Sequence, residues 1–366
     1  MGFRCGIVGL PNVGKSTLFN ALLSTIQAEA ANYPFCTIEP NLGRVLVPDE
    51  RLVKLATIAG SKETIPTQLE FVDIAGLVRG ASKGEGLGNK FLSHIREVDA
   101  IMYVLRCFED PDVVHVEGRV DPLRDADTVE TELLLADLES LEKRLPVLQK
   151  KAKGGDKDAM EQIVIMERVL VQLNANKPAR TVELRDANEK KILSMMQLLT
   201  GKPVLYVCNV DEGSAATGNA MSKVVEEMAT PRGAPCVVVS ARIEAEISLL
   251  TSADDKRDFL DSLGLTQTGL ARVIHAGYQL LELITYFTVG PKETRAWTIP
   301  AGTMAPQAAG VIHTDFEKGF IRAETVAYAD YIEFDGESGA KKAGKFRLEG
   351  KEYAVQDGDV LHFRFA

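Results

Sequence analysis

A phosphate-binding loop is the sequence feature that most constrains this chain. Residues 9–16 read Gly-Leu-Pro-Asn-Val-Gly-Lys-Ser and fit the pattern G-x-x-x-x-G-K-S/T at every fixed position. The apolar run at residues 3–8 predicts a buried strand before the loop, and the apolar spacing in residues 17–23 predicts a helix after it. The motif needs this context, because the glycines let successive N–H groups converge on phosphates. A chance glycine turn is the alternative.

The side chains of this loop have separate expected roles. Lys15 is expected to reach the β- and γ-phosphates, and the hydroxyl of Ser16 is expected to bind Mg²⁺. Asn12 has two interpretations: it helps to hold a monovalent cation such as K⁺, or it is only a tolerant loop position. The expected nucleotide contacts of the loop are Asn12, Val13, Gly14, Lys15, Ser16 and Thr17.

Composition limits what the loop can belong to. A chain of 366 residues is long for one core and predicts two or three domains. No run of 18 apolar residues and no signal-peptide pattern is present, so we expect a cytoplasmic protein without a membrane segment. Five scattered cysteines, none spaced as C-x-x-C, argue against a disulfide framework and a zinc site. The net charge of −10 means that any contact with nucleic acid has to be local.

Two segments downstream are placed to complete a magnesium site. Residues 31–41 form a polar segment where P-loop switch proteins carry a Mg²⁺-binding threonine; Thr37 is the candidate, and an ordinary connecting loop is the alternative. Residues 68–73 predict a strand that ends in Asp-x-x-Gly. Asp73 is expected to hold Mg²⁺ through water, and the Gly76 N–H is expected to bind a γ-phosphate oxygen.

Further apolar strands are predicted to extend a parallel sheet. Residues 98–106, 201–209 and 235–239 each read as a buried strand, and helical segments lie between them. Strands that alternate with helices indicate crossover connections, and such sheets bind ligands at the carboxyl ends of their strands. The ends at Asn209 and Ser240 are therefore candidate ligand positions.

An insertion between the fourth and fifth strands predicts an antiparallel helical hairpin. Apolar residues repeat at 4-3-4-3 spacing from Leu134 to Leu148 and at 3-4-3 spacing from Ile163 to Leu173. This periodicity is typical of two helices that pack along one seam.

The turn of this hairpin is rich in lysine and glycine. Residues 150–157 supply the turn, and Asp158 with Glu161 predicts a capping box for the second helix. Pro146 predicts a kink or an early break in the first helix. The basic turn has two interpretations: it contacts RNA or an acidic protein surface, or it is a solvated tip.

The C-terminal part predicts a small β-rich module around one helix. Short strands are expected at residues 285–289, 295–299, 332–334, 353–355 and 360–365. Gly358 predicts a tight turn before the last strand. Basic residues with exposed aromatics would suit RNA, and packing between domains is the alternative; the basic residues are Lys318, Arg322, Lys341, Lys342 and Lys345.

The order of these motifs resembles that of the translation-factor-related P-loop GTPases. Residues 32–41, residues 73–89 and the C-terminal segment are similar to the Obg-like ATPase (YchF) family, and the resemblance covers essentially the full chain. Residues 310–320 resemble the signature of a TGS domain, a β-grasp module that usually binds RNA or ribosomal surfaces. The expected fold class is an α/β, GTPase-like P-loop NTPase domain with a mostly parallel sheet, an inserted α-helical coiled-coil hairpin and a C-terminal β-grasp (TGS) domain. The expected boundaries are 1–125 with 200–282 for the nucleotide-binding domain, 126–199 for the hairpin and 283–366 for the TGS domain.

The base-recognition tetrad departs from that of guanine-binding relatives. Guanine-reading proteins usually have Asn-Lys-x-Asp, whereas residues 209–212 read Asn-Val-Asp-Glu, so the final carboxylate is one methylene longer. A misplaced charged acceptor weakens guanine preference, and the resemblance implies ATP instead. The alternative is that the carboxylate still serves guanine. The expected base contacts are Asn209, Val210 and Glu212, with Ser240 and Ala241 closing over the base.

The hydrolytic group is not evident from the motifs. Leu77 follows the Asp-x-x-Gly, where a water-positioning glutamine often sits, and an apolar side chain cannot orient water. His115 lies in a predicted loop and could swing toward the γ-phosphate, although a lone histidine also has structural explanations. The catalytic candidates are Lys15, Gly76 and His115, and the metal candidates are Ser16, Thr37 and Asp73.

The sequence thus predicts a molecular switch that hydrolyses ATP to ADP and phosphate with Mg²⁺. By resemblance its partner is the ribosome, with the large subunit expected, or a translation-related complex, and local RNA contact is expected through the TGS domain and the hairpin. A GTP-specific switch is one alternative. A nucleotide-binding interaction protein without turnover is another.

Overall fold

The computed structural model describes residues 3–30, 42–74, 87–116 and 118–366. The chain divides into two compact units, each built from separate segments. The larger consists of residues 4–43 and 70–276, and the smaller of residues 1–3, 44–69 and 277–366. No helix in the described ranges is both long enough and apolar enough to cross a membrane.

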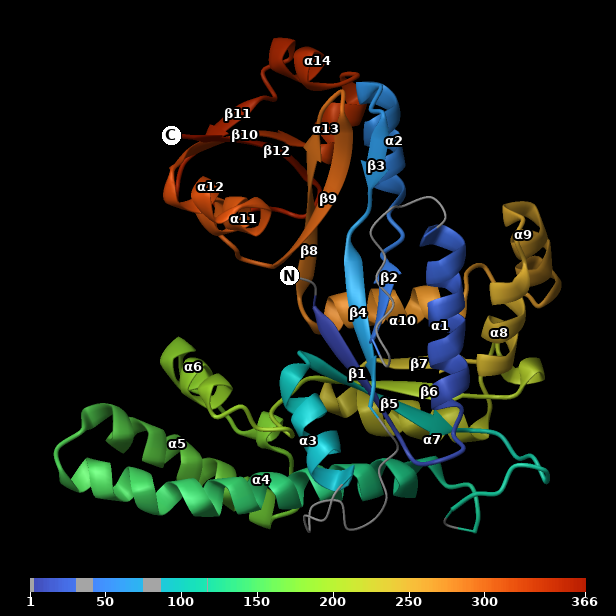
Figure 1. The fold of residues 1–366 in the computed structure, drawn as a ribbon, viewed down its shortest axis with the longest axis vertical. Coiled ribbons are helices and arrows are strands. Elements are labelled where there is room, and N and C mark those ends of the chain that lie inside the picture. Colours follow the sequence, from blue (N-terminus) through green and yellow to red (C-terminus); the bar gives the residue numbers. More distant parts are fainter. Residues whose placement is uncertain (1–2, 31–41, 75–86, 117) are drawn as a thin grey trace. The chain divides into compact units, whose positions relative to one another are not determined.

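The larger unit is an α/β structure around a sheet in the order β2-β4-β1-β5-β6-β7, and the strands from β4 to β7 in this order are parallel (Figure 1). The sheet strands are β1 (Arg4–Val8), β2 (Leu42–Leu46), β4 (Gln68–Asp73), β5 (Ala100–Arg106), β6 (Val204–Asn209) and β7 (Cys236–Val239). The helices are α1 (Lys15–Ala30), α3 (Leu87–Glu97), α4 (Pro122–Lys153), α5 (Lys157–Asn174), α6 (Ala187–Met195), α7 (Ala220–Ala229), α8 (Ala241–Leu249), α9 (Ala253–Ser262) and α10 (Gly269–Leu280).

The centre of this sheet is fully buried, as its continuous apolar runs require. Every residue of β5 and β6 is buried, because helices cover a parallel sheet on both faces. The strands end at a common edge, where β1, β4 and β6 lead into the predicted ligand-binding residues. The predicted parallel sheet is therefore confirmed.

Helices α4 and α5 form the predicted hairpin and lie side by side (Figure 1). Asp121 caps α4 by accepting a hydrogen bond from the Arg124 N–H, and Pro122 occupies the first turn. The seam buries apolar residues of both helices, including Leu134, Leu141, Ile165, Met166, Val169 and Leu173.

Two local details of this hairpin differ from the prediction. Of the kink or early break predicted at Pro146, the early break does not occur, since α4 continues through Pro146 to Lys153. Pro146 and Glu142, whose carbonyl loses its usual donor, are both exposed, so water can satisfy that carbonyl. The cap of α5 is Asp156, which accepts from the Ala159 N–H at 3.0 Å, and no capping box starts at Asp158.

The smaller unit is a mixed sheet in the order β11-β10-β12-β8-β9-β3. Its strands are β3 (Glu63–Ile65), β8 (Leu283–Val289), β9 (Glu293–Pro300), β10 (Phe320–Ala327), β11 (Arg347–Glu349) and β12 (Asp359–Phe365). Its helices are α2 (Glu50–Ala59), α11 (Ala305–Ile312), α12 (Thr314–Lys318), α13 (Tyr328–Glu333) and α14 (Glu337–Lys342). Gly358, with φ +87°, forms the expected turn before β12.

Alternation along the strands gives this sheet two separate cores. Tyr286 and Leu361 face α11, whereas the neighbouring Phe287 and Val360 pack with Leu55 of α2. The second core shows that residues 44–69 are part of the same module as the C-terminal strands, which the sequence did not predict. The predicted domain boundaries stay a prediction.

The strand predictions for this module were partly wrong. Residues 332–333 lie in α13, and residues 353–355 contribute only an isolated bridge, from Ala354 to Met304. Strands β10 and β11 were not predicted. β10 does not alternate strictly between buried and less buried positions, and it pairs with β12 along its length, so its register depends on a partner distant in sequence.

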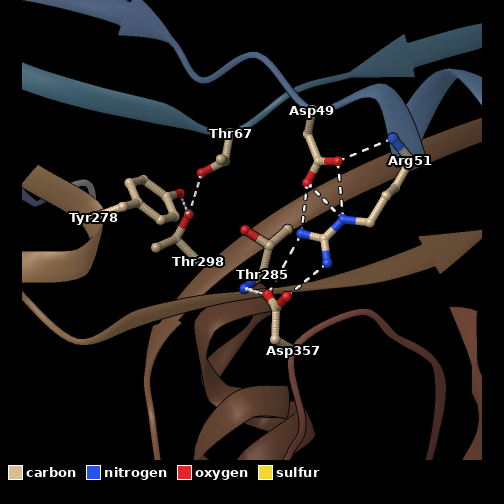
Figure 2. A network of polar contacts seen from close by, with 7 residues as sticks. All are labelled: Asp49, Arg51, Thr67, Tyr278, Thr285, Thr298 and Asp357. Carbon is tan, nitrogen blue, oxygen red and sulfur yellow. Dashed lines mark hydrogen bonds and ion pairs between the residues drawn. The ribbon is translucent and has the colours of Figure 1, made fainter. Parts of the chain in front are cut away.

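Hydrogen bonds and ion pairs connect residues 49–67 to the C-terminal strands of the same unit (Figure 2). Arg51 donates to Asp49 and, through Nη1, to Asp357 Oδ2 at 2.6 Å, and Asp357 Oδ1 accepts from the Thr285 N–H at 2.9 Å. These carboxylates raise the pKa of the Arg51 guanidinium, although burial lowers it in part. The same network includes a 2.6 Å hydrogen bond between the hydroxyls of Thr67 and Thr298.

We expect Asp357→Ala to lower the free energy of unfolding by about 1–3 kcal/mol, because it removes one of the two carboxylate partners of Arg51 and the acceptor of the Thr285 N–H. Chemical denaturation monitored by the fluorescence of Trp297, which lies in β9, measures the effect. Glu352→Ala, which removes an exposed carboxylate in the same unit, is the matched control. Equal stability of the two variants would contradict the role of the network.

Candidate functional site

The phosphate loop is the turn between β1 and α1. β1 ends at Val8 and α1 begins at Lys15, so the strand–loop–helix context is confirmed. Gly14 has φ +98°, and a Cβ there would lie 2.2 Å from Nδ2 of Asn209, so only glycine fits. The free N–H groups and positive end of α1 are therefore available to a phosphate.

Lys15 is held inside this loop. Its side chain is buried, and Nζ donates to the Leu10 carbonyl at 2.6 Å. Burial lowers the pKa of Lys15 to about 8, and the charge of Asp73 opposes that shift. A bound triphosphate would add negative charge at this point and favour the protonated ammonium.

Asp73, at the end of β4, fits a magnesium site that is shared with phosphate. Its Oδ1 is buried and has no hydrogen-bond partner in the described ranges, and burial raises the pKa of this carboxyl while Lys15 lowers it. No cluster of three or more His, Cys, Asp or Glu able to hold a metal occurs among the described residues. Mg²⁺ commonly binds through one or two side-chain oxygens with phosphate and water, a set that Asp73 and the Ser16 hydroxyl suit. Thr37 and Gly76 lie outside the described residues.

Asn209, at the end of β6, connects the phosphate loop to the start of α8. Its Nδ2 donates to the Val13 carbonyl at 2.9 Å, and its Oδ1 accepts from the Ala241 N–H at 2.9 Å. The Val210 N–H donates to the Val239 carbonyl in the adjacent strand. The structure thus brings together the predicted residues of the loop, β6 and the β7–α8 junction.

Glu212 and Ser240 complete the predicted base-binding residues. Ser240 is buried, and its Oγ has no hydrogen-bond partner in the part of the chain that the structure describes. Glu212 begins a short 3₁₀ helix, Glu212–Ser214, and its Oε1 lies 2.9 Å from Nε of Arg242. The carboxylate that corresponds to the guanine acceptor is therefore in an ion pair.

His115 lies beside the phosphate loop, but its imidazole is turned toward α4. Nε2 lies 2.8 Å from Oδ2 of Asp125, and both side chains are buried. The carbonyl of the preceding Val114 accepts from Nδ2 of Asn12 at 3.1 Å. A role for His115 in hydrolysis stays a prediction.

Sequence reasoning missed Arg106, Asp125 and Arg242. Arg106, fully buried at the end of β5, donates to three main-chain carbonyls of the loop that follows. A charged residue at the end of an all-apolar strand could have drawn attention to Arg106. No local pattern pairs Asp125 with His115 or Arg242 with Glu212, because these contacts form only in three dimensions.

Comparison with known proteins agrees with this geometry. Residues 4–150 match the family profile described as 50S ribosome-binding GTPase, and residues 283–366 match the YchF-GTPase_C profile, described as a protein of unknown function (DUF933). The chain is 58% identical over 365 residues to the ribosome-binding ATPase YchF of Pasteurella multocida (strain Pm70), covering 100% of this chain and 99% of that one. It is 54% identical over 367 residues to the protein of the same name from Bacillus subtilis (strain 168), with both chains fully covered.

The chain belongs to the YchF family. Its fold is similar to the solved structure of the Schizosaccharomyces pombe YchF GTPase, with a TM-score of 0.88 and 39% identity over 99% of this chain and 98% of that chain. A GTP-binding protein from Pyrococcus horikoshii OT3, 20% identical with a TM-score of 0.63 over 100% of both chains, shares the fold. These matches confirm the predicted family and fold class, and P-loop NTPases of this kind generally use Mg²⁺.

We expect Asn209→Ala to weaken ATP and GTP binding to a similar degree, by about tenfold or more, because it removes the two hydrogen bonds that join the phosphate loop to the start of α8. Titration calorimetry with each nucleotide measures the effect, with thermal melting to check folding. Asn188→Ala, which removes an exposed amide on α6, is the control. A loss confined to one purine would show instead that Asn209 reads the base.

Proposed function

We propose that this YchF-family chain binds ATP with Mg²⁺, hydrolyses it to ADP and phosphate, and binds the ribosome. Relatives at 54–58% identity over the full chain are named ribosome-binding ATPases. The S. pombe relative is named a GTPase, so names alone do not decide the base. The observation that carries the choice of ATP is the ion pair between Glu212 and Arg242.

Guanine recognition needs a free acceptor at the position of Glu212. Guanine presents the N1–H and the exocyclic amine as donors, and an unpaired carboxylate accepts from both. Here the guanidinium of Arg242 occupies that carboxylate and places further N–H donors beside it. Adenine has an acceptor at N1, where guanine has a donor, so the pair favours adenine. The Arg242 side chain is 78% exposed and that of Glu212 is 47% exposed, so water weakens the ion pair and limits the size of the preference.

Hydrolysis would depend on charge stabilisation at the phosphate loop. Lys15 and the N–H groups at the start of α1 are placed to stabilise negative charge that develops on the β- and γ-phosphates. Mg²⁺, held by Ser16 and Asp73 with Thr37 as a further candidate, would supply charge neutralisation of the phosphates. Roles for Gly76 and for K⁺ at Asn12 remain part of the proposal.

Ribosome binding would be local, because the chain carries a net charge of −10. Four exposed lysines gather at the end of the α4–α5 hairpin, and a phosphate backbone would attract them: Lys150, Lys151, Lys153 and Lys157. Contact with ribosomal RNA through this end and the C-terminal module, and with the large subunit, is proposed on that basis. A cytoplasmic location follows from a ribosomal partner.

A phosphate-release assay tests the proposed function. We expect release from ATP to exceed release from GTP and to rise when ribosomes are added. Lys15→Met should reduce release by about a hundredfold or more, because it removes the cation at the phosphates. If no phosphate were released under any condition, the proposed hydrolysis would be rejected in favour of a nucleotide-binding interaction protein without turnover. If release from GTP exceeded release from ATP, the chain would instead be a GTP-specific switch.

The base assignment has its own test. Arg242→Ala should tighten GTP binding by about fivefold relative to ATP, because it frees Glu212 to accept from guanine. The double variant Glu212→Gln/Arg242→Ala should lose that gain. Arg257→Ala, which breaks the exposed ion pair with Asp254 on α9, serves as the control in the same titrations. An unchanged ratio of the two affinities in Arg242→Ala would refute the explanation.

A further inference from the structure

The loop between β5 and α4 contacts the phosphate loop and the helical hairpin through consecutive residues. The Val114 carbonyl accepts from Nδ2 of Asn12 at 3.1 Å. The next residue, His115, lies with Nε2 2.8 Å from Oδ2 of Asp125, in the first turn of α4. A short segment of main chain thus connects the phosphate loop to the first turn of α4.

In residues 114–116 the apolar side chains are exposed and the polar side chain between them is buried, which is the reverse of the usual pattern. Val114 and Val116 are 74% and 50% exposed, whereas His115 between them is 8% exposed. All five histidines lie in the described ranges, and His115 is the one that is buried. Exposing valines and burying an imidazole both cost free energy, so a specific contact has to hold this arrangement.

Asp125 provides that contact. Its carboxyl is 1% exposed, and burial raises its pKa, while the hydrogen bond and charge of His115 lower it. The other oxygen, Oδ1, is buried without a hydrogen-bond partner in the described part of the chain. The hydrogen bond to His115 is thus the main side-chain interaction that offsets the cost of burying the Asp125 carboxyl. The same bond holds the imidazole against α4.

The remainder of the loop is rigidly fixed. The Arg106 guanidinium donates to the carbonyls of Phe108, Asp110 and Val113. Asn219, at the start of α7, donates from Nδ2 to the Cys107 carbonyl at 2.7 Å. Because residues 107–113 are anchored in this way, a rearrangement would be concentrated in residues 114–116.

We propose that Asp125 is a positioning residue that holds His115 in its buried orientation, and that breaking this contact inverts residues 114–116. Inversion would bury Val114 and Val116 and turn the imidazole outward beside the phosphate loop. α4 carries Asp125 in its first turn and ends at the basic turn of the hairpin, so a partner bound at that end would contact the same helix that holds His115. The consequence for hydrolysis rests on the proposed ATPase function; the positioning itself does not.

Chemical modification of histidines with diethyl pyrocarbonate, mapped by mass spectrometry, tests the positioning directly. In the wild-type protein we expect His115 to be protected while His94, His275, His313 and His362 react. Asp125→Ala should raise the modification rate of His115 by about tenfold or more, the factor expected from one lost charge-assisted hydrogen bond. Asp127→Ala, which removes an exposed carboxylate from the same helix, should leave the rate unchanged. Continued protection of His115 in a folded Asp125→Ala protein would overturn the proposal.

A measurement on the wild-type protein covers the case in which Asp125→Ala does not fold. A non-hydrolysable ATP analogue together with ribosomes should increase the modification of His115, with His94 in α3 and His275 in α10, outside the proposed ribosome contacts, as internal references. Protection of His115 in every nucleotide state, with and without ribosomes, would also overturn the proposal.

Single-turnover hydrolysis then tests the consequence for the reaction. Asp125→Ala should hydrolyse ATP faster than wild type without ribosomes and should respond less to them, whereas His115→Asn should be slow in both conditions. Labelling that follows the prediction, combined with no hydrolysis by any variant, would reject the ATPase function and keep the positioning role.

Discussion

The candidate site depends on one buried amide. Asn209 donates to the Val13 carbonyl and accepts from the Ala241 N–H, so it fixes the phosphate loop against the ends of β6 and β7. Both polar ends of the side chain are satisfied, which a buried amide requires. The close approach of Asn209 also explains why Gly14 cannot carry a side chain. The phosphate loop and the candidate base-binding residues are therefore held together by the same group, and the loop alone does not define the candidate site.

The sequence predicted the parts of this site that depend on local spacing. The phosphate loop, the Asp73 that ends β4 and the Asn209 that ends β6 all follow from motifs next to apolar strands. The contacts that give these residues their environment could not be predicted. The pairs His115–Asp125 and Glu212–Arg242 join separate elements, and no periodicity marks which side chain a loop or helix will meet. The break expected at Pro146 failed for a related reason, because packing along the α4–α5 seam overrides a local preference.

In the C-terminal module, too, local sequence patterns could not predict which distant segments pack together. Its β8, β9 and β12 strands follow from alternating apolar residues, but β3 and α2 come from the first quarter of the chain. β3 pairs with β9, and α2 covers one face of the sheet, yet nothing in residues 44–69 indicates a partner so far along the sequence. The polar network around Arg51 confirms how firmly that segment is built into the module (Figure 2).

This arrangement has a consequence for how the protein is made. During synthesis, residues 44–69 emerge long before residues 277–366, with which they share a sheet and a core. Until then the pairing edge of β3 and the apolar face of α2 have no native cover, since contacts between distant segments form only after both exist. The nascent chain therefore carries an unfinished module from the time residues 44–69 emerge until residues 277–366 have also been made.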